Sequence, residues 1–310
     1  MQKMGQTKKQ HYVPQFLLKH FSASPKETKP ICVFDKAEDK FFTASCRDVG
    51  HENKFYESGN SSGGAIEAES LTEFIDTSAA PVISKIATTG KFDITPTDAS
   101  KLNHFVAMQL VRGPSIRNSM EELRKGIVSK WGSDVCAEGD DKPVSQYTEE
   151  DSNFSSIEFL STVPEFAGIL SEKIWFLNSA PADCSFIISD NPVVRHNYLD
   201  YGRRGSLGIK QDGIEMFLPI SPEYCLSILC PKLAGQVVLS GEMQEEMRLQ
   251  REGLAVPLEP ENVEFVNSLE VIQSERYLYG RTEMDLSIGK EMIAYCQELG
   301  DTWSQRSRPR

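Results

Sequence analysis

The stretch that most restricts the fold is residues 186–193, with the sequence Phe-Ile-Ile-Ser-Asp-Asn-Pro-Val. Its three apolar residues predict a short buried strand, and the polar triplet that follows ends at Pro192. Proline biases Asn191 away from helical backbone angles, and Asp and Asn side chains stabilise turns by bonding nearby backbone groups. We therefore expect Asp190 to project from the end of a buried strand, where rigid scaffolds often carry functional side chains.

Charge and cysteine content restrict the partners and the compartment. The formal net charge is −12, so there is no overall attraction to phosphate backbones or anionic membranes, and a nucleic-acid partner requires a local basic cleft. The seven cysteines form no close CxxC pair, which indicates neither a zinc knuckle nor a disulfide framework. No apolar run approaches the roughly 18 residues of a membrane span. We expect a cytoplasmic protein without a membrane partner; a protein partner and the oligomeric state stay open.

The first part of the chain predicts a helix and a hairpin. Pro14 suits the first turn of a helix, and the apolar residues around it fall near helical spacing. Residues 31–45 contain two β-rich runs around a turn-like centre, which predicts a hairpin. The polar loop that follows contains His51, for which we predict a surface position.

The middle of the chain predicts two long helices. Apolar residues at helical spacing run from about 66 to 86, with acids that include Glu67 and Asp76 between them. These acids can hold a metal ion, although an acidic helix face is more often only solvated. A second helix is expected to start within residues 95–98, and Gly and Pro at 113–114 end or kink it.

The second half predicts a late antiparallel sheet covered by helices. In order, we expect an exposed insertion at 137–153, a helix at about 155–173, paired strands at 174–177 and 186–188, strands at 216–219 and 224–229, a helix at 260–276, an extended piece at 277–279 and a terminal helix at about 284–299. Together these elements predict a single α+β domain over residues 11–300. Residues 1–10 and the basic residues 301–310 are expected to be flexible tails.

Three cationic or titratable residues stand at predicted helix ends. Arg112 and Arg117 flank the break after the second long helix, where two guanidinium groups can grip a phosphate or a carboxylate. Arg112 can equally be a buried structural partner of Asp190 or of another acid. His11 precedes the first helix, where an imidazole can serve as acid, base or metal ligand, or can only bond the start of the helix.

Five short motifs occur in a fixed order along the chain. They are His11-Tyr12-Val13-Pro14 with Leu18 and Phe21, Gln109 with Arg112-x-Pro114-x-x-Arg117, Phe186 with Ser189-Asp190-Asn191-Pro192-Val193, Leu218-Pro219-Ile220-Ser221-Pro222, and Asn267 with Ser274-x-Arg276. This ordered set resembles the bacterial domain-of-unknown-function family numbered 4238, from about residue 10 to 280. The resemblance implies a single-domain unit and a short set of polar positions, His11, Arg112, Asp190, Asn191 and Asn267. Asp76 stands where that pattern leads us to expect a glutamate.

The first functional hypothesis is a metal-dependent nuclease or phosphodiesterase with a role in bacterial conflict such as phage defence. Asp190 and Asp76 would hold Mg²⁺ or Mn²⁺, the ions that carboxylates favour, and His11 would act as acid or base. Arg112 would clamp the phosphate. The substrate would be bound and oriented by three further residues, Arg117, Asn191 and Asn267.

The second hypothesis is a non-catalytic binding or interaction protein whose polar motif residues form a buried structural network. In it Asp190 accepts hydrogen bonds from Arg112 and from turn backbone groups, because buried charges are costly unless they are paired. An enzyme acting on a small molecule is a third alternative. The chain has no GxGxxG, P-loop, GxSxG or HExxH signature. Convergence of His11, Arg112 and Asp190 in an open cleft would favour the enzyme, and complete pairing inside the core would favour the interaction protein.

Overall fold

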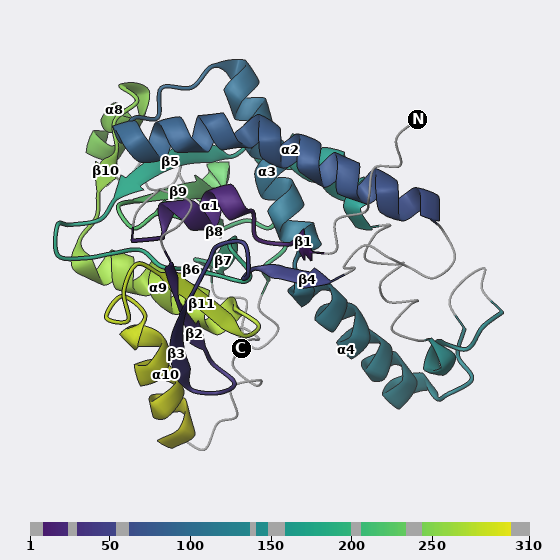
Figure 1. The fold of residues 1–310 in the computed structure, drawn as a ribbon. Coiled ribbons are helices and arrows are strands. Elements are labelled where there is room, and N and C mark those ends of the chain that lie inside the picture. The colour runs from purple at the N-terminus through teal and green to yellow at the C-terminus, as the bar shows by residue number, and fades with distance from the viewer. Residues whose placement is uncertain are drawn as a thin grey trace, which may run out of the picture.

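The computed structural model describes residues 9–23, 30–53, 62–136, 141–147, 159–199, 206–233 and 244–298. Its helices are α1 Gln15–His20, α2 Ser62–Thr89, α3 Pro96–Arg112, α4 Pro114–Trp131, α6 Val163–Ser171, α8 Gln244–Arg251, α9 Pro260–Gln273 and α10 Ser287–Glu298, with short 3₁₀ turns η1 Val144–Gln146 and η2 Leu160–Thr162 (Figure 1). Within these ranges no helix combines the length and the apolar content that a membrane crossing requires.

The largest sheet has five strands in the order β10-β5-β9-β8-β7. They are β10 Val256–Pro257, β5 Ile174–Ser179, β9 Tyr224–Leu229, β8 Ile214–Ser221 and β7 Val194–Asn197. Strand β10 pairs parallel to β5, and the other pairs are antiparallel. The β8–β9 hairpin turns at Ser221, whose hydroxyl accepts hydrogen bonds from the backbone N–H groups of Glu223 and Tyr224 at 3.2 and 3.1 Å.

Helices cover both faces of this sheet. Along β8, alternate side chains point to opposite faces. Met216 and Leu218 pack in the main core with residues of α1, α2, α3 and α6. Phe217, between them in sequence, packs on the other face with Val263 and Val266 of α9. Strand β8 is therefore buried on both faces, which explains its nearly continuous apolar sequence.

A second sheet has four antiparallel strands in the order β3-β2-β11-β6. They are β3 Lys40–Ala44, β2 Ile31–Asp35, β11 Tyr277–Gly280 and β6 Ile188–Ser189. Strand β11 follows α9 late in the chain and lies between β2 and β6, so this sheet joins three distant segments. A two-stranded ribbon, β1 Lys9–His11 with β4 His51–Asn53, lies beside it (Figure 1).

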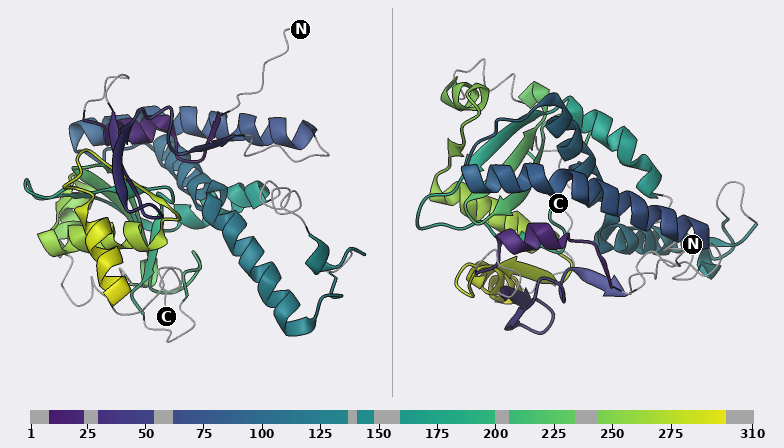
Figure 2. Two further views of the ribbon diagram at one scale, coloured as in Figure 1. Left: turned by 60° about the horizontal axis from the view of Figure 1, so that its bottom comes forward. Right: turned by 45° about the horizontal axis from the view of Figure 1, so that its top comes forward.

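The long helices form one side of the molecule. Thr95 caps α3 through a capping box with Asp98, and the predicted break at residues 113–114 separates α3 from α4. Helix α4 extends away from the two larger sheets, whereas α2 and α3 cross above the five-stranded sheet (Figure 2). The α+β fold, the N-terminal hairpin, the helical middle and the late antiparallel sheet are thus confirmed.

Several local predictions are wrong. The strands at 174–177 and 186–188 do not pair with each other, because β5 joins β9 and β6 joins β11 in different sheets. Lys9 and Gln10, assigned to a flexible tail, belong to β1. His51 is not in a surface loop but in β4, opposite His11 in the ribbon.

Other predictions are only partly testable. Of the helix at 155–173, residues 163–171 are helical as α6 after the turn η2, and 155–158 lie outside the described residues. Residues 1–8, 301–310 and much of the insertion at 137–153 also lie outside them.

Candidate functional site

Asp190 follows β6 directly, as predicted, but its carboxylate faces the protein interior. The residue is 2% exposed. Its Oδ1 accepts a hydrogen bond from the backbone N–H of Glu275 at 2.8 Å, and its Oδ2 accepts from the N–H groups of Arg276 and Tyr277 at 2.7 and 2.8 Å. Asp190 therefore ties the end of β6 to the segment that connects α9 with β11.

The charge of Asp190 is balanced by its surroundings only in part. Burial raises the pKa of Asp190 to about 6, although the three backbone N–H groups and nearby Lys36 favour the charged form. Lys36 is itself buried, which lowers its pKa to about 8. Its ammonium group donates to the carbonyl oxygens of Val271 and Ser274 at 2.9 and 2.6 Å. We call Lys36, Asp190 and the adjacent Glu270 the buried charge cluster.

Glu270 on α9 is the most deeply buried acid of this cluster. Its exposed fraction is 0%, and no well-aligned hydrogen bond from the described residues reaches either carboxylate oxygen, although Ser189 lies nearby. Burial raises the pKa of Glu270 well above its usual value, and the negative charge of Asp190 adds to this shift. The neighbouring Ser189 favours the ionised form too weakly to offset burial. Folding therefore favours the protonated form of the Glu270 carboxyl.

Glu270→Gln should remove a pH dependence of folding. The folded pKa lies above the unfolded one, so the stabilisation is present below the unfolded pKa of 4.5 and is lost as pH rises through the folded pKa. Relative to Glu270→Gln, wild type should lose about 1.4 kcal/mol per pH unit between the unfolded pKa and the folded pKa. Urea unfolding of both proteins from about pH 4 to about pH 8 measures the difference. The exposed Glu264→Gln is the control, and parallel curves for wild type and Glu270→Gln would contradict the assignment.

The two asparagines of the motifs also bond the backbone. Asn191 Nδ2 donates to the carbonyl oxygen of Gln273 at 3.2 Å. Asn267 Oδ1 accepts from the N–H of Ile187 at 3.0 Å, and its Nδ2 donates to the carbonyl oxygen of Ser185 at 2.8 Å. Both amides thus hold the 185–191 segment against α9. Hydrogen bonds to buried backbone groups are typical of residues with a structural role.

Arg112 at the end of α3 lies next to Asp76 on α2. Its Nη1 donates to Asp76 Oδ2 at 2.9 Å, and its side chain is 0% exposed. In the amide orientation of Gln109 that satisfies its hydrogen bonds, the side-chain oxygen faces Arg112 and accepts a hydrogen bond from its Nε at 3.1 Å. Of the two roles left open by the sequence, the structure places Arg112 in a buried ion pair, with Asp76 rather than Asp190 as the partner. Arg117 lies on α4, and its side chain is outside the described residues.

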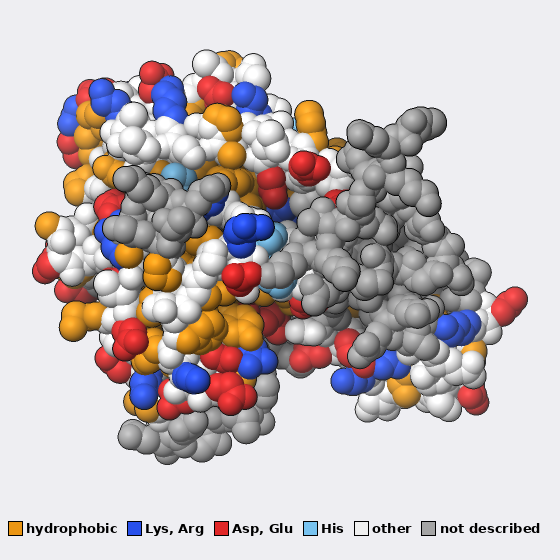
Figure 3. All heavy atoms as spheres, viewed as in Figure 1, with side chains coloured by type: hydrophobic (Ala, Val, Ile, Leu, Met, Phe, Trp, Pro, Cys, Tyr) orange, Lys and Arg blue, Asp and Glu red, His pale blue; other side chains and the backbone are white. Residues whose placement is uncertain are grey.

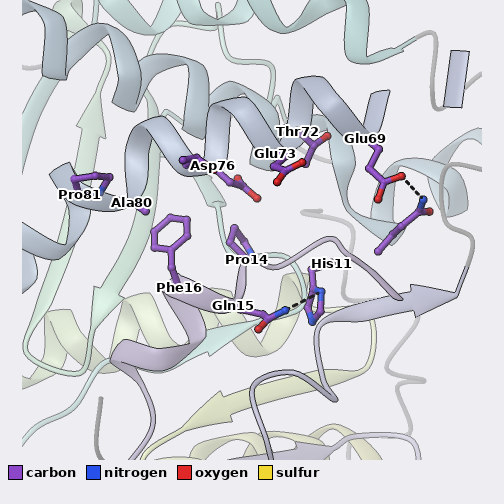
Figure 4. Close-up of a pocket in the computed structure, with 12 residues that line it drawn as sticks. His11, Pro14, Gln15, Phe16, Glu69, Thr72, Glu73, Asp76, Ala80 and Pro81 are labelled. Atoms are coloured by element: carbon purple, nitrogen blue, oxygen red, sulfur yellow. Dashed lines mark hydrogen bonds between the residues drawn. The ribbon is translucent and has the colours of Figure 1, made fainter. Parts of the chain in front are cut away.

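Asp76 also lines a pocket whose walls combine acidic, amide and apolar side chains. The pocket has a volume of about 630 Å³ and lies between α2 and residues 10–16 (Figure 4). Asp76 Oδ1 is buried and has no hydrogen-bond partner among the described residues. Burial raises the pKa of Asp76, and Arg112 opposes that shift. Glu69 and Glu73 of α2 line the same pocket, and Figure 4 shows them extending from the helix toward the chain around His11.

His11 forms part of the opposite wall of this pocket. Its Nδ1 lies 3.5 Å from Gln15 Nε2, and its ring packs edge-on against His51 with 5.1 Å between centroids. Gly50, at a φ of 64°, turns the chain into β4, and its carbonyl oxygen accepts from the N–H groups of Tyr12 and Val13 at 2.9 and 3.1 Å. A side chain at Gly50 would be strained and would press on Val13, so a glycine suits this turn.

The predicted site residues thus fall into two groups. His11, Asp76 and Arg112 lie at or behind the pocket, and Asp190 and the two asparagines lie in the structural bonds around β6 and α9. In the part of the chain that the structure describes, no three His, Cys, Asp or Glu side chains are arranged to hold a metal ion. The Mg²⁺ or Mn²⁺ site stays a prediction. On the face drawn in Figure 3, the coloured Lys and Arg side chains are interspersed with Asp and Glu.

Sequence reasoning missed the composition of the pocket. Glu69 and Glu73 were visible as acids on a helix face, and their spacing of four and three residues up to Asp76 places all three on one side of α2. Nothing in the sequence connected this face with His11, because the contact depends on tertiary packing. Lys36 and Glu270 gave no sequence signal of their burial.

Comparison with curated proteins and with solved structures found no match to this chain. A family model described as "Protein of unknown function (DUF4238)" matches residues 9–284. This span includes the three sheets of the described residues, the pocket and the buried charge cluster. The chain therefore belongs to the DUF4238 family of proteins of unknown function.

Proposed function

We propose that this protein is a non-catalytic binding protein whose recognition site is the pocket between α2 and residues 10–16. In this proposal the polar residues of the family motifs stabilise the fold and do not act on a substrate. The observation that carries the proposal is the carboxylate of Asp190, which accepts three hydrogen bonds from consecutive backbone N–H groups and is 2% exposed.

The geometry of Arg112 supports the same proposal. A guanidinium that clamps a phosphate must present its donors to the ligand. The Arg112 side chain is fully buried and bonded to Asp76. An anion would have to break this ion pair inside the protein, where leaving either charge unpaired costs a large free energy. The two motif asparagines support it as well, since Asn267 bonds backbone groups just before β6 and Asn191 bonds the carbonyl oxygen of Gln273 at the end of α9.

The pocket has the features of a ligand site. Its volume of about 630 Å³ lies within the range of small-molecule pockets, and it combines apolar walls with a few convergent polar groups. A buried carboxylate oxygen without a partner, Asp76 Oδ1, is available to a hydrogen-bond donor if the pocket adjusts around a ligand.

The competing proposal is the metal-dependent nuclease with a role in phage defence, and a degradation assay tests the two against each other. Purified protein is incubated with RNA, tRNA, single-stranded DNA and duplex DNA in Mg²⁺, Mn²⁺ or EDTA. We expect no cleavage above the buffer control in any combination. Cleavage that disappears in EDTA and in a folded His11→Ala variant would overturn the binding proposal. The melting curve of the variant, compared with Glu264→Gln, checks that it is folded.

A further inference from the structure

We propose that the pocket binds an alkylammonium group, a primary ammonium carried on a short alkyl chain. This inference rests on the proposed binding function and names the class of its ligand. A linear diamine or polyamine and the side chain of a lysine share this chemistry. The argument comes from the acidic face, the unpartnered acceptors and the apolar end of the same pocket.

The acidic face belongs to α2. Glu69, Glu73 and Asp76 follow one another at spacings of four and three residues, so their side chains lie along one side of the helix. From Glu69 to Asp76 the helix axis rises by roughly 10 Å. The described residues that line the pocket include no lysine or arginine, and Arg112 lies behind Asp76. The pocket therefore favours a cation and disfavours a phosphate.

A buried acceptor without a hydrogen bond supplies the second, independent observation. Asp76 Oδ1 is buried and accepts no hydrogen bond among the described residues, while Oδ2 is held by Arg112. Pro81 stands inside α2 and has no N–H to donate to the carbonyl oxygen of Thr77, one turn earlier. Asp76, Thr77 and Pro81 all line the pocket. An ammonium group has three donors and no acceptor, so it complements a site that offers acceptors.

The apolar end of the pocket explains the alkyl chain. Figure 4 shows Phe16, Ala80 and Pro81 together at one end, and Glu69 at the other. A ligand with methylene groups next to its charge can bury the methylenes against the apolar end. Its ammonium group then lies among the carboxylates of Glu73 and Asp76. A bare metal ion would leave the apolar end without a contact.

The burial of Asp76 adds a reason for a bound cation. Burial raises the pKa of this carboxyl, which means that its charged form is costly in the folded protein even beside Arg112. A bound ammonium supplies a second opposite charge in the same low-dielectric surroundings. Binding should therefore weaken as salt increases and as Asp76 or Glu73 loses its charge.

Isothermal titration calorimetry on the full chain tests the inference, with 1,4-diaminobutane as the probe and 1,4-butanediol as its neutral analogue. We expect the diol to bind at least about tenfold more weakly than the diamine, a difference of about 1.4 kcal/mol. Glu73→Gln, which changes an exposed residue, should weaken diamine binding about fivefold, as expected for one partly screened ion pair. Asp76→Asn should weaken it more, and Glu264→Gln, an exposed acid on α9, should leave it unchanged.

Each outcome bears on the inference. Tighter binding of a capped lysine peptide than of the diamine supports an alkylammonium ligand and indicates that a protein side chain carries it. Equal affinity for diamine and diol, or full diamine affinity in both Glu73→Gln and Asp76→Asn, overturns it. Absence of any diamine binding overturns the ligand class and leaves the proposed binding function standing. Metal-dependent cleavage in the degradation assay overturns the proposed function instead.

Discussion

Asp190→Ala is expected to lower the free energy of unfolding by about 3–5 kcal/mol at neutral pH. The substitution leaves the backbone N–H groups of Glu275, Arg276 and Tyr277 without the acceptor that the 2% exposed Asp190 side chain provides. Each unsatisfied buried donor costs about 1–3 kcal/mol, and removal of a charge that burial disfavours offsets a part of the total. Urea unfolding followed by circular dichroism measures the change.

The exposed Asp183 provides the matched control for this experiment. Asp183→Ala should change stability by less than about 0.5 kcal/mol, as is usual for a surface position. A loss below about 1 kcal/mol in Asp190→Ala would show that the three backbone N–H groups find other partners, and the structural role of Asp190 would then be wrong.

Asp76→Ala is expected to cost a similar amount, about 3–5 kcal/mol, for an electrostatic reason. It leaves the Arg112 guanidinium fully buried without its carboxylate, and an unpaired buried charge is strongly destabilising. Replacing both residues by apolar ones, as in Asp76→Leu with Arg112→Met, should recover much of the loss, because the charge and its partner are then removed together.

A double-mutant cycle over these variants measures the coupling. Unfolding free energies of Asp76→Leu, Arg112→Met and the double variant, set against wild type, should show that the double variant is more stable than the sum of the single effects predicts. Additive effects would mean that the 2.9 Å contact contributes nothing to folding. They would also contradict the assignment of Arg112 as the partner that binds one of the two carboxylate oxygens of Asp76.

The position of Asp190 shows which structural features local sequence patterns predict and which they do not. The apolar run before it and the proline after it are local signals, and they correctly predict a carboxylate at the end of a buried strand. Its hydrogen-bond partners lie 85 to 87 residues later in the chain, and no local pattern encodes them. The same limit explains why β5 and β6 were paired wrongly, since a short apolar run predicts a strand but not its neighbour.

The pocket shows the same division. Helical spacing places Glu69, Glu73 and Asp76 on one side of α2, and all three line the pocket. The opposite wall carries His11, 65 residues before Asp76, which comes to the pocket through the ribbon of β1 and β4. The sequence left open an acidic partner for Arg112, and tertiary packing determines that this partner is Asp76.

The ribbon of β1 and β4 gives the pocket two walls of unequal rigidity. Helix α2 is anchored in the main core, whereas each ribbon strand has three residues and pairs only with the other among the described strands. An isolated two-stranded ribbon has little stability of its own, and local opening requires less free energy than global unfolding. The wall that bears His11 is thus able to yield while both larger sheets keep their hydrogen bonds. Admission of a ligand is then a local rearrangement of the amino-terminal segment, which leaves the acceptors on α2 in place.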